Sequence, residues 1–336
     1  MSLRIATAFA FLALLTPRAA ARLTSSEPTD NLFAFFQPTI QLSDDERRRL
    51  DGRAIVVRIL PAEGHELAAM AAGTLNVGPD PFIASITNIV ALKKGPFVPQ
   101  IGRFSAQPRL EDLGELTLDD VDLDEIRRCQ PGRCGLKLDG EEIKQLQQAI
   151  STAQPGSKAP VETEFRRVVL ERATRFLHEG DRSTKVQFST LLQNSPYLHA
   201  RMPQLAVYLD KYPAPLPGAE SFLYWCKETY AWKPMISVTQ VTIMRGNADG
   251  GPEVVVASRD VFATRYTSGS FVLTFLFGDP ANASKRYLVY VNRTWIDGIR
   301  ALWRPFVEHR VRSQARKVFA TVRDRIEHNA AALTSR

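Results

Sequence analysis

The feature that most constrains the fold is a run of five strand-like segments followed by one long amphipathic helix. The segments are rich in β-branched and aromatic residues and are separated by turn signals, such as the tripeptide GDP at 278–280. Strands this close in sequence pair antiparallel, because a parallel crossover needs a dozen or more residues. Apolar residues recur at helical spacing over 295–331, so this helix is expected to cover the sheet. The five segments are 221–230, 234–245, 253–267, 270–277 and 285–293.

The chain before these strands mixes strand and helix patterns. The β-branched segment 54–60 predicts a strand, whereas 67–77 fits either a strand or a helix because alanine dominates its first half. A helix is expected over 82–92, where apolar residues recur at helical spacing after a Gly-Pro-Asp-Pro start. The sequence therefore predicts a linker and short helix over 22–53, then a single α+β domain over 54–330 with a mostly helical insertion at about 105–215.

The N-terminus has the parts of a signal peptide. Arg4 precedes a run of eleven mostly apolar residues, and Ala19 and Ala21 are small side chains that fit a signal-peptidase site. The run is short of the ~20 residues that a spanning helix needs, although an uncleaved anchor remains the alternative. We expect residues 1–21 to be removed after Ala21 and the protein to be exported, periplasmic or secreted.

The net charge indicates which classes of binding partner to expect. The chain carries a formal charge of +7 with a pI near 9.4, and export makes nucleic acid an improbable partner. Over 295–336 there are nine Lys or Arg residues against four acids. A basic helix with an apolar face can lie on an anionic membrane surface. The alternative is that its apolar face packs on the sheet while its arginines are solvated.

Two of the three cysteines lie close together. Cys129 and Cys134 flank a Pro-Gly turn signal, which predicts a local disulfide in an oxidising compartment. So small a loop contributes about 2 kcal/mol by loop-closure entropy. A redox pair or half of a metal site is the alternative, but redox pairs usually have two intervening residues and no second pair has zinc spacing. Cys226, in an apolar aromatic segment, is expected to be a buried free thiol.

No motif for a metal, a cofactor or catalysis is found. Residues 120–124 match the start of a calcium-binding loop, but the required glycine is Glu125 and the required glutamate is Pro131. We therefore expect a packed segment with an acidic face, and we predict no cofactor. The histidines are scattered and belong to no metal or nucleophile motif; they are His65, His178, His199, His309 and His328.

The order of elements resembles the helix-grip architecture of START, polyketide-cyclase and related lipid-transfer (SRPBCC) proteins. An early strand, an amphipathic helix, a run of antiparallel strands and a long C-terminal helix carry this resemblance, over about 54–98 and 220–330. It implies an antiparallel sheet wrapped around the last helix, with an apolar cavity between them.

A second resemblance rests on short motifs. The Cys-x4-Cys-Gly-x-Lys-Leu element at 129–138 and the segment YLVYVNR at 287–293 are similar to a family of uncharacterised exported bacterial proteins. This resemblance implies export and a shared two-cysteine element, and it implies no substrate.

Three hypotheses for function follow. The first is an exported binding or carrier protein for a lipid or other hydrophobic ligand, without covalent chemistry. The second is an enzyme on the same scaffold, with Arg265 or Arg293 beside Tyr266 or Asp260 in the cavity. The third is an envelope interaction or structural protein with a filled core. The residues expected to line the cavity in the first case are Tyr224, Met235, Phe262, Tyr266, Phe271, Leu273, Tyr290, Arg293 and Phe306.

Overall fold

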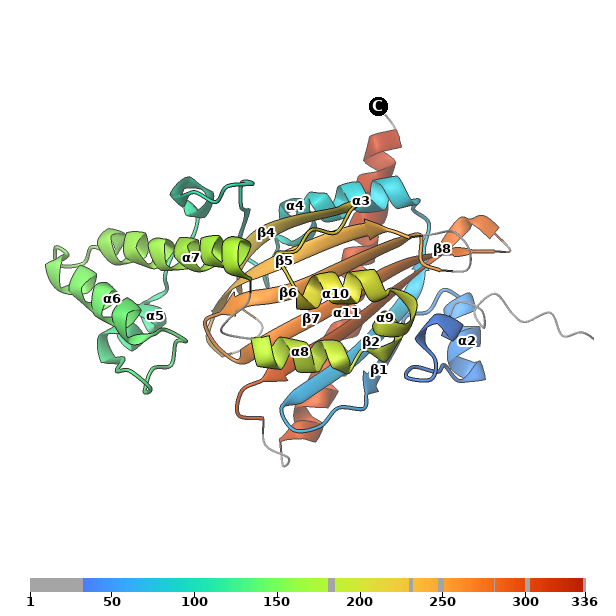
Figure 1. Cartoon of the computed structure of the whole chain (residues 1–336), viewed down its shortest axis with the longest axis horizontal. Coiled ribbons are helices and arrows are strands. Elements are labelled where there is room, and N and C mark those ends of the chain that lie inside the picture. The colour runs from blue at the N-terminus through green and yellow to red at the C-terminus, as the bar shows by residue number, and fades with distance from the viewer. Residues whose placement is uncertain are drawn as a thin grey trace, which may run out of the picture.

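The computed structural model describes residues 33–180, 185–229, 232–246, 251–280, 282–299 and 303–334 (Figure 1). The predicted signal peptide, 1–21, lies outside the described residues, as does most of the predicted linker. Within the described residues, no helix is both long and apolar enough to cross a membrane.

One sheet of eight strands forms the centre of the molecule, and every neighbouring pair is antiparallel. The strand order is β1-β2-β8-β7-β6-β5-β4-β3, so the α+β class and the predicted five-strand run are confirmed. The ambiguous segment 67–77 is mostly strand, because β2 pairs with β1 on one side and β8 on the other. The strands are β1 Val56–Leu60, β2 Glu66–Leu75, β3 Gln100–Arg103, β4 Ala219–Glu228, β5 Met235–Arg245, β6 Val254–Ala263, β7 Thr267–Asp279 and β8 Asn282–Ile296.

Helices cover both faces of this sheet (Figure 1). The short helix expected near residue 44 is confirmed, and a reciprocal capping box between Ser43 and Glu46 starts it. The described chain between β3 and β4 is helical. The helices are η1 Ala34–Phe36, α2 Asp44–Asp51, α3 Pro79–Thr87, α4 Ile89–Lys93, η2 Leu110–Leu113, α5 Asp120–Arg128, α6 Gly140–Thr152, α7 Ala159–Glu179, α8 Lys185–Gln193, α9 Pro196–Arg201, α10 Pro203–Asp210 and α11 Arg304–Thr334.

The predicted start of the C-terminal helix is wrong. Trp295 and Ile296 still belong to β8, and α11 begins at Arg304. Trp295 pairs in register with Glu66 of β2 and stacks on His65, at 5.6 Å between ring centroids. Pairing with strands on both sides therefore extends β8 through residues whose apolar spacing also fits a helix.

One face of the sheet, here called the closed face, is packed with aromatic rings. Phe36 lies 5.2 Å from both Tyr197 and Phe275 between ring centroids, and all three side chains are at most 2% exposed. Helices η1, α8, α9 and α10 cover this part of the closed face. Helices α5, α6 and α7 cover a second apolar cluster on the same face, around Trp225 and Phe262.

The other face, here called the α11 face, carries α3, α4 and the last helix. Helix α11 contacts chiefly β1, β2, α3 and α4. A Cβ atom at Gly73 in β2 would lie 2.7 Å from the ring of Phe319, so glycine permits the helix to approach the strand this closely. Phe319, Ile326 and Ala330 are buried, which fixes the second half of α11 on the sheet.

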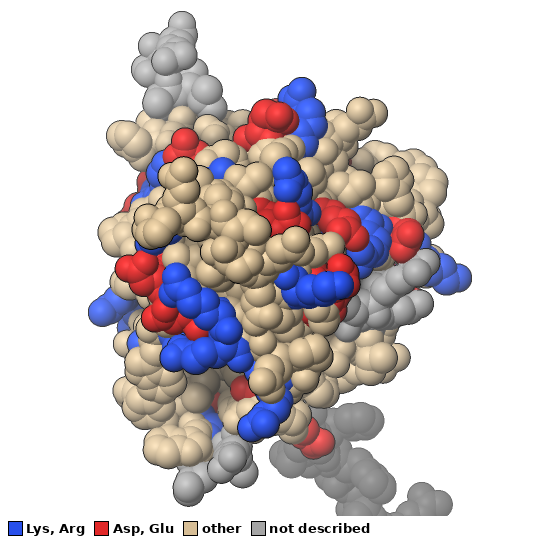
Figure 2. All heavy atoms as spheres, turned by 90° about the vertical axis from the view of Figure 1, so that its left-hand side faces the viewer, with Lys and Arg blue, Asp and Glu red and all other residues tan. Residues whose placement is uncertain are grey.

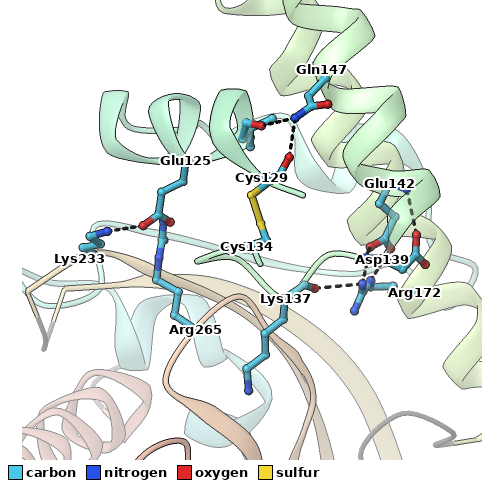
Figure 3. The surroundings of a disulfide bond; sticks show 11 residues. Glu125, Cys129, Cys134, Lys137, Asp139, Glu142, Gln147, Arg172, Lys233 and Arg265 are labelled. Carbon is cyan, nitrogen blue, oxygen red and sulfur yellow. Dashed lines mark hydrogen bonds and ion pairs between the residues drawn. A yellow bond between two sulfur atoms is a disulfide. The ribbon is translucent and has the colours of Figure 1, made fainter. Parts of the chain in front are cut away.

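A disulfide and an ion-pair network organise the insertion (Figure 3). The predicted Cys129–Cys134 disulfide is present, just after α5, and the amide of Gln147 donates to the Cys129 carbonyl oxygen. The segment at 120–128 is the packed helix α5 rather than a calcium loop. Its Glu125 pairs with Arg265 at the end of β6 and with Lys233, which ties the insertion to the sheet.

Candidate functional site

Polar side chains line part of the α11 face in the middle of the sheet. They come from β6, β7 and β8, and each keeps partial contact with solvent although its strand is central. Side chains that alternate with them on the closed face are buried. This surface, here called the polar floor, consists of Ser258, Asp260, Ser270, Thr274, Tyr290, Asn292 and Thr294.

The alternation of β7 and β8 places these residues on one face. Successive side chains of a strand point to opposite faces, so polar and apolar residues separate. The register then brings Ser270 opposite Thr294 and Thr274 opposite Tyr290. The polar floor therefore spans neighbouring strands, and the partly exposed Val272 lies within it, between Ser270 and Thr274 and opposite Asn292.

Hydrogen bonds connect one side of the polar floor. The hydroxyls of Ser270 and Thr294 are 3.3 Å apart, and the Thr294 hydroxyl donates to Asn292 Oδ1 at 2.6 Å. Asn292 Nδ2 donates in turn to the Tyr290 hydroxyl at 3.1 Å. Hydroxyl and amide groups have more than one donor or acceptor position, so this row retains capacity to bind a ligand.

A group of ionisable side chains, here called the lysine cluster, borders the polar floor at β4. Lys93, the last residue of α4, donates to the Tyr224 hydroxyl at 2.9 Å and to Glu228 at 3.4 Å. The Cys226 thiol lies 3.5 Å from the same Glu228 oxygen and 3.4 Å from the Ser237 hydroxyl. Cys226 is buried and free, as predicted.

Asp260 belongs to the polar floor and interacts electrostatically with Glu228 and Lys93 of the lysine cluster. It lies in register with Thr239 of β5, whose hydroxyl donates to Asp260 Oδ1 at 3.0 Å. Burial raises the pKa of Asp260 to about 7 and repulsion from Glu228 adds to the increase, while the Thr239 hydrogen bond and the charge of Lys93 oppose it. Asp260 therefore exchanges its proton near neutral pH.

Lys93, Tyr224 and Cys226 hold their protons at neutral pH. Burial raises the pKa of Cys226 to about 12 and that of Tyr224 further. Burial alone would lower the pKa of Lys93, but Tyr224, Cys226 and Glu228 outweigh it and hold that pKa well above its usual value. The site thus offers the Lys93 ammonium group, several hydroxyl groups, the carboxyl group of Glu228 and the Asp260 carboxyl group, which titrates near pH 7. Within the described residues, no group of three His, Cys, Asp or Glu side chains is placed to hold a metal.

The structure divides the predicted cavity residues between the two faces. Tyr224 and Tyr290 lie on the α11 face, and Met235 shares that face because it precedes Ser237 by two residues in β5. Tyr266 lies after β6, where its hydroxyl donates to the Lys233 carbonyl oxygen, and Phe306 is 56% exposed on α11. The remaining four, on the closed face, cannot line one cavity with Tyr224; they are Phe262, Phe271, Leu273 and Arg293.

The pairs suggested for an enzyme do not form. Arg265 is bound by Asp122 and Glu125 of α5, and Arg293 is bound by Glu66 on the closed face. Asp260 lies on the α11 face, where the charges of Lys93 and, to a smaller extent, Lys137 lower its pKa. Both arginines therefore hold the fold together and are not available as partners of Asp260.

Four residues of the site have no signal as site residues in the sequence: Lys93, Glu228, Thr239 and Asn292. Lys93 marked the end of a helix, and the other three were polar residues within predicted strands. The signal that could have found them is polar residues at alternate positions of several strands. Recognising a common site also needs the register, which the sequence does not supply.

Comparison of the chain with protein-family models finds no match, and comparison with curated proteins finds none either. The arguments about function therefore rest on the geometry and chemistry of the site.

Proposed function

We propose that the protein is an exported binding or carrier protein whose ligand is an amphiphile of the lipid class. The observation that carries this proposal is the polar floor, which is partly accessible to solvent in the centre of an otherwise buried sheet. A central strand of a sheet covered on both faces would normally bury both of its faces. Accessible polar groups there are a suitable place for the head group of a bound molecule.

The order of elements supports a helix-grip arrangement. Strand β2, helices α3 and α4, strand β3, the meander β4–β8 and helix α11 follow in the order of the START-like proteins, and β2 lies beside β8. Strand β1 and the helices between β3 and β4 are additions to that order. In such an arrangement the ligand lies between the sheet and the last helix, which is the side that carries the polar floor.

The packing favours an amphiphile over a wholly apolar ligand. The apolar part of the α11 face, including Val241, Ile243 and Val256, is already buried under α3, α4 and Phe319. The first half of α11 offers apolar side chains with solvent contact, including Val307 and Val311. We therefore place the head group on the polar floor and the apolar part against this half of α11.

The proposed location is outside the cytoplasm. A disulfide between Cys129 and Cys134 persists in an oxidising compartment and is rare in the cytoplasm of mesophiles. Together with the N-terminal pattern, it supports export. The carrier proposal then means transport or storage of an envelope amphiphile.

Native mass spectrometry of the protein recovered after export tests the proposal. We expect a stoichiometric lipid-sized adduct that organic extraction releases and identifies. Asn292→Leu, which replaces the floor amide with a larger apolar group of the same branched shape, should lower adduct occupancy at least about tenfold, the equivalent of one or two lost hydrogen bonds. Thr163→Val, at a partly exposed position of α7, is the control and should keep the adduct. A clean mass after incubation with envelope lipids would contradict the proposal and favour an interaction protein.

An acid–base enzyme is the second candidate, because Asp260 titrates near pH 7 beside a charged lysine. General acid–base catalysis is most efficient when the catalytic pKa is near the working pH. If the extracted ligand is converted by the protein, Asp260→Asn should abolish conversion and preserve binding. Conversion that survives this substitution would exclude Asp260 as the general acid or base.

A further inference from the structure

Exposed aromatic side chains gather at one end of the sheet. Among the large apolar side chains that are exposed in the described residues, the four aromatic ones are Phe97 at 55%, Trp232 at 91%, Trp303 at 60% and Phe306 at 56%. The remaining three are valines. Single exposed apolar side chains are common on proteins, so the informative feature here is that all the exposed aromatic ones lie at a common end of the sheet.

The strand register places these four residues at a common end. Phe97 accepts a hydrogen bond from the Thr229 amide at 3.0 Å, just after β4 ends, and Trp232 lies before β5 begins. Trp303 and Phe306 lie at the start of α11. Arg304 fixes that start by donating to the carbonyl oxygens of Gly64 and Glu66, where β2 begins. Because neighbouring strands are antiparallel, the last residues of β4 and the first residues of β5 and β2 lie at the same end of the sheet.

The polar floor reaches the same end. Asp260 and Thr294 lie near the C-terminal ends of β6 and β8, and both of these strands end at the same end of the sheet as the aromatic residues. The aromatic residues therefore lie at the same end of the sheet as part of the polar floor. The insertion also reaches this end, where Glu125 of α5 pairs with Lys233, the residue after Trp232.

Charge identifies the kind of partner. Residues 309–323 of α11 contain no acidic residue, and Arg312, Arg316 and Lys317 are exposed there. By contrast, Figure 2 shows Lys and Arg interspersed with Asp and Glu on the side of the molecule formed by the insertion. Aromatic rings with adjacent basic groups suit the interfacial region of an anionic bilayer, where rings enter the head-group layer and cations meet lipid phosphates.

We propose that Phe97, Trp232, Trp303 and Phe306 form a docking surface for an anionic lipid bilayer, with the basic half of α11 beside it. The rings enter the interface and Arg312, Arg316 and Lys317 hold the surface by charge. The bilayer is favoured over a protein partner because the exposed basic residues Arg312, Arg316 and Lys317 follow Phe306 on the same helix, and an anionic surface complements their charge. Docking does not require the carrier function, although it would present the polar floor to the membrane.

Vesicle co-sedimentation of the exported protein tests this surface. We expect binding to vesicles of phosphatidylglycerol and phosphatidylcholine in equal parts, weaker binding to phosphatidylcholine alone, and weakening by salt. The double variant Trp232→Ser with Trp303→Ser should lose at least about tenfold in partitioning, because each ring contributes apolar burial at the interface. Since both side chains are exposed, the variant should unfold at the same urea concentration as the wild type.

Matched controls distinguish binding through this surface from nonspecific adsorption to vesicles. Val186→Ser with Val207→Ser changes two exposed apolar side chains elsewhere and should leave partitioning unchanged. Arg312→Glu with Lys317→Glu should reduce binding to the anionic vesicles alone. Equal binding by the tryptophan variant and the valine control would overturn the proposal. So would self-association without vesicles that the tryptophan variant abolishes, since the surface would then bind a second copy of the chain. Adduct occupancy measured on the same variants reports the carrier function separately.

Discussion

Strand β7 contributes to both faces of the sheet, and the two faces differ. Phe271 and Phe275 point to the closed face and are at most 1% exposed, whereas Ser270 and Thr274 point to the α11 face and keep solvent contact. The closed face is covered by aromatic rings and by helices supplied from the long segment between β3 and β4. The α11 face is covered firmly only where α3, α4 and the second half of α11 pack.

This difference indicates that the closed face stabilises the fold and the α11 face binds the ligand. Substitutions on the closed face should reduce stability, because its rings and ion pairs are buried and mutually dependent. Substitutions on the polar floor should be nearly neutral for stability and should change ligand binding.

The largest effect is expected on the closed face. Phe275→Ala removes a ring that lies 5.2 Å from Phe36 and 5.3 Å from Phe35 between centroids, so unfolding should become easier by about 3–5 kcal/mol. Its neighbour Thr274→Val, on the polar floor, should change stability by about 0.5 kcal/mol or less. Urea unfolding followed by circular dichroism measures both. Similar losses for the two variants would mean that the faces do not differ in this way.

The next effect concerns the buried ion pairs. Glu66 is 2% exposed and pairs with Arg293 and the Asn194 amide, so Glu66→Gln leaves a buried guanidinium without its carboxylate and should cost about 3 kcal/mol. Glu228→Gln on the α11 face, beside a partly exposed Lys93, should cost about 1 kcal/mol. The same urea experiment compares them. A larger loss for Glu228→Gln would show that the lysine cluster is structural.

Much of this fold follows from local patterns. The strands of the C-terminal third, the capped helix at Ser43 and the Cys129–Cys134 disulfide could be predicted because neighbouring residues determine each of them. The start of α11 could not, because Trp295 and Ile296 fit the helical period and only pairing with β2 and β7 makes them strand.

The candidate site is less accessible to sequence reasoning. Tyr224 and Tyr290 could be placed on one surface, but Phe271 and Leu273 could not be excluded without knowing which face each strand presents to which helices. Lys93 reaches Tyr224 across 131 positions of sequence. Contacts of that range depend on register and on helix packing, and a single sequence contains no direct signal for either.

The Cys129–Cys134 disulfide tests whether the insertion affects only the closed face of the sheet. Cys129→Ser with Cys134→Ser should reduce stability by about 2 kcal/mol, because the unfolded chain regains the entropy of a small loop. The double variant avoids leaving a single free thiol. Because α5, α6 and α7 cover the closed face, adduct occupancy at the polar floor should not change. Loss of the adduct in a protein that remains folded would show that the insertion acts on the α11 face.

The smallest effect depends on pH and comes from Asp260. Its pKa is raised to about 7 in the folded protein, so the folded state keeps a proton that the unfolded state has already lost. Stability from this group is therefore complete below the usual carboxyl pKa and is lost as pH rises through about 7.

Asp260→Asn removes this pH-dependent loss. The free energy of unfolding of the variant, relative to the wild type, should therefore increase by about 1–2 kcal/mol from pH 5 to pH 8, since solvent contact limits the penalty. Thr239→Val removes the hydrogen bond that lowers this pKa and should move the pH midpoint upward. A pH-independent difference between Asp260→Asn and the wild type would show that Asp260 is ionised in the folded state throughout, and that the α11 face is wetter at this position than its burial indicates.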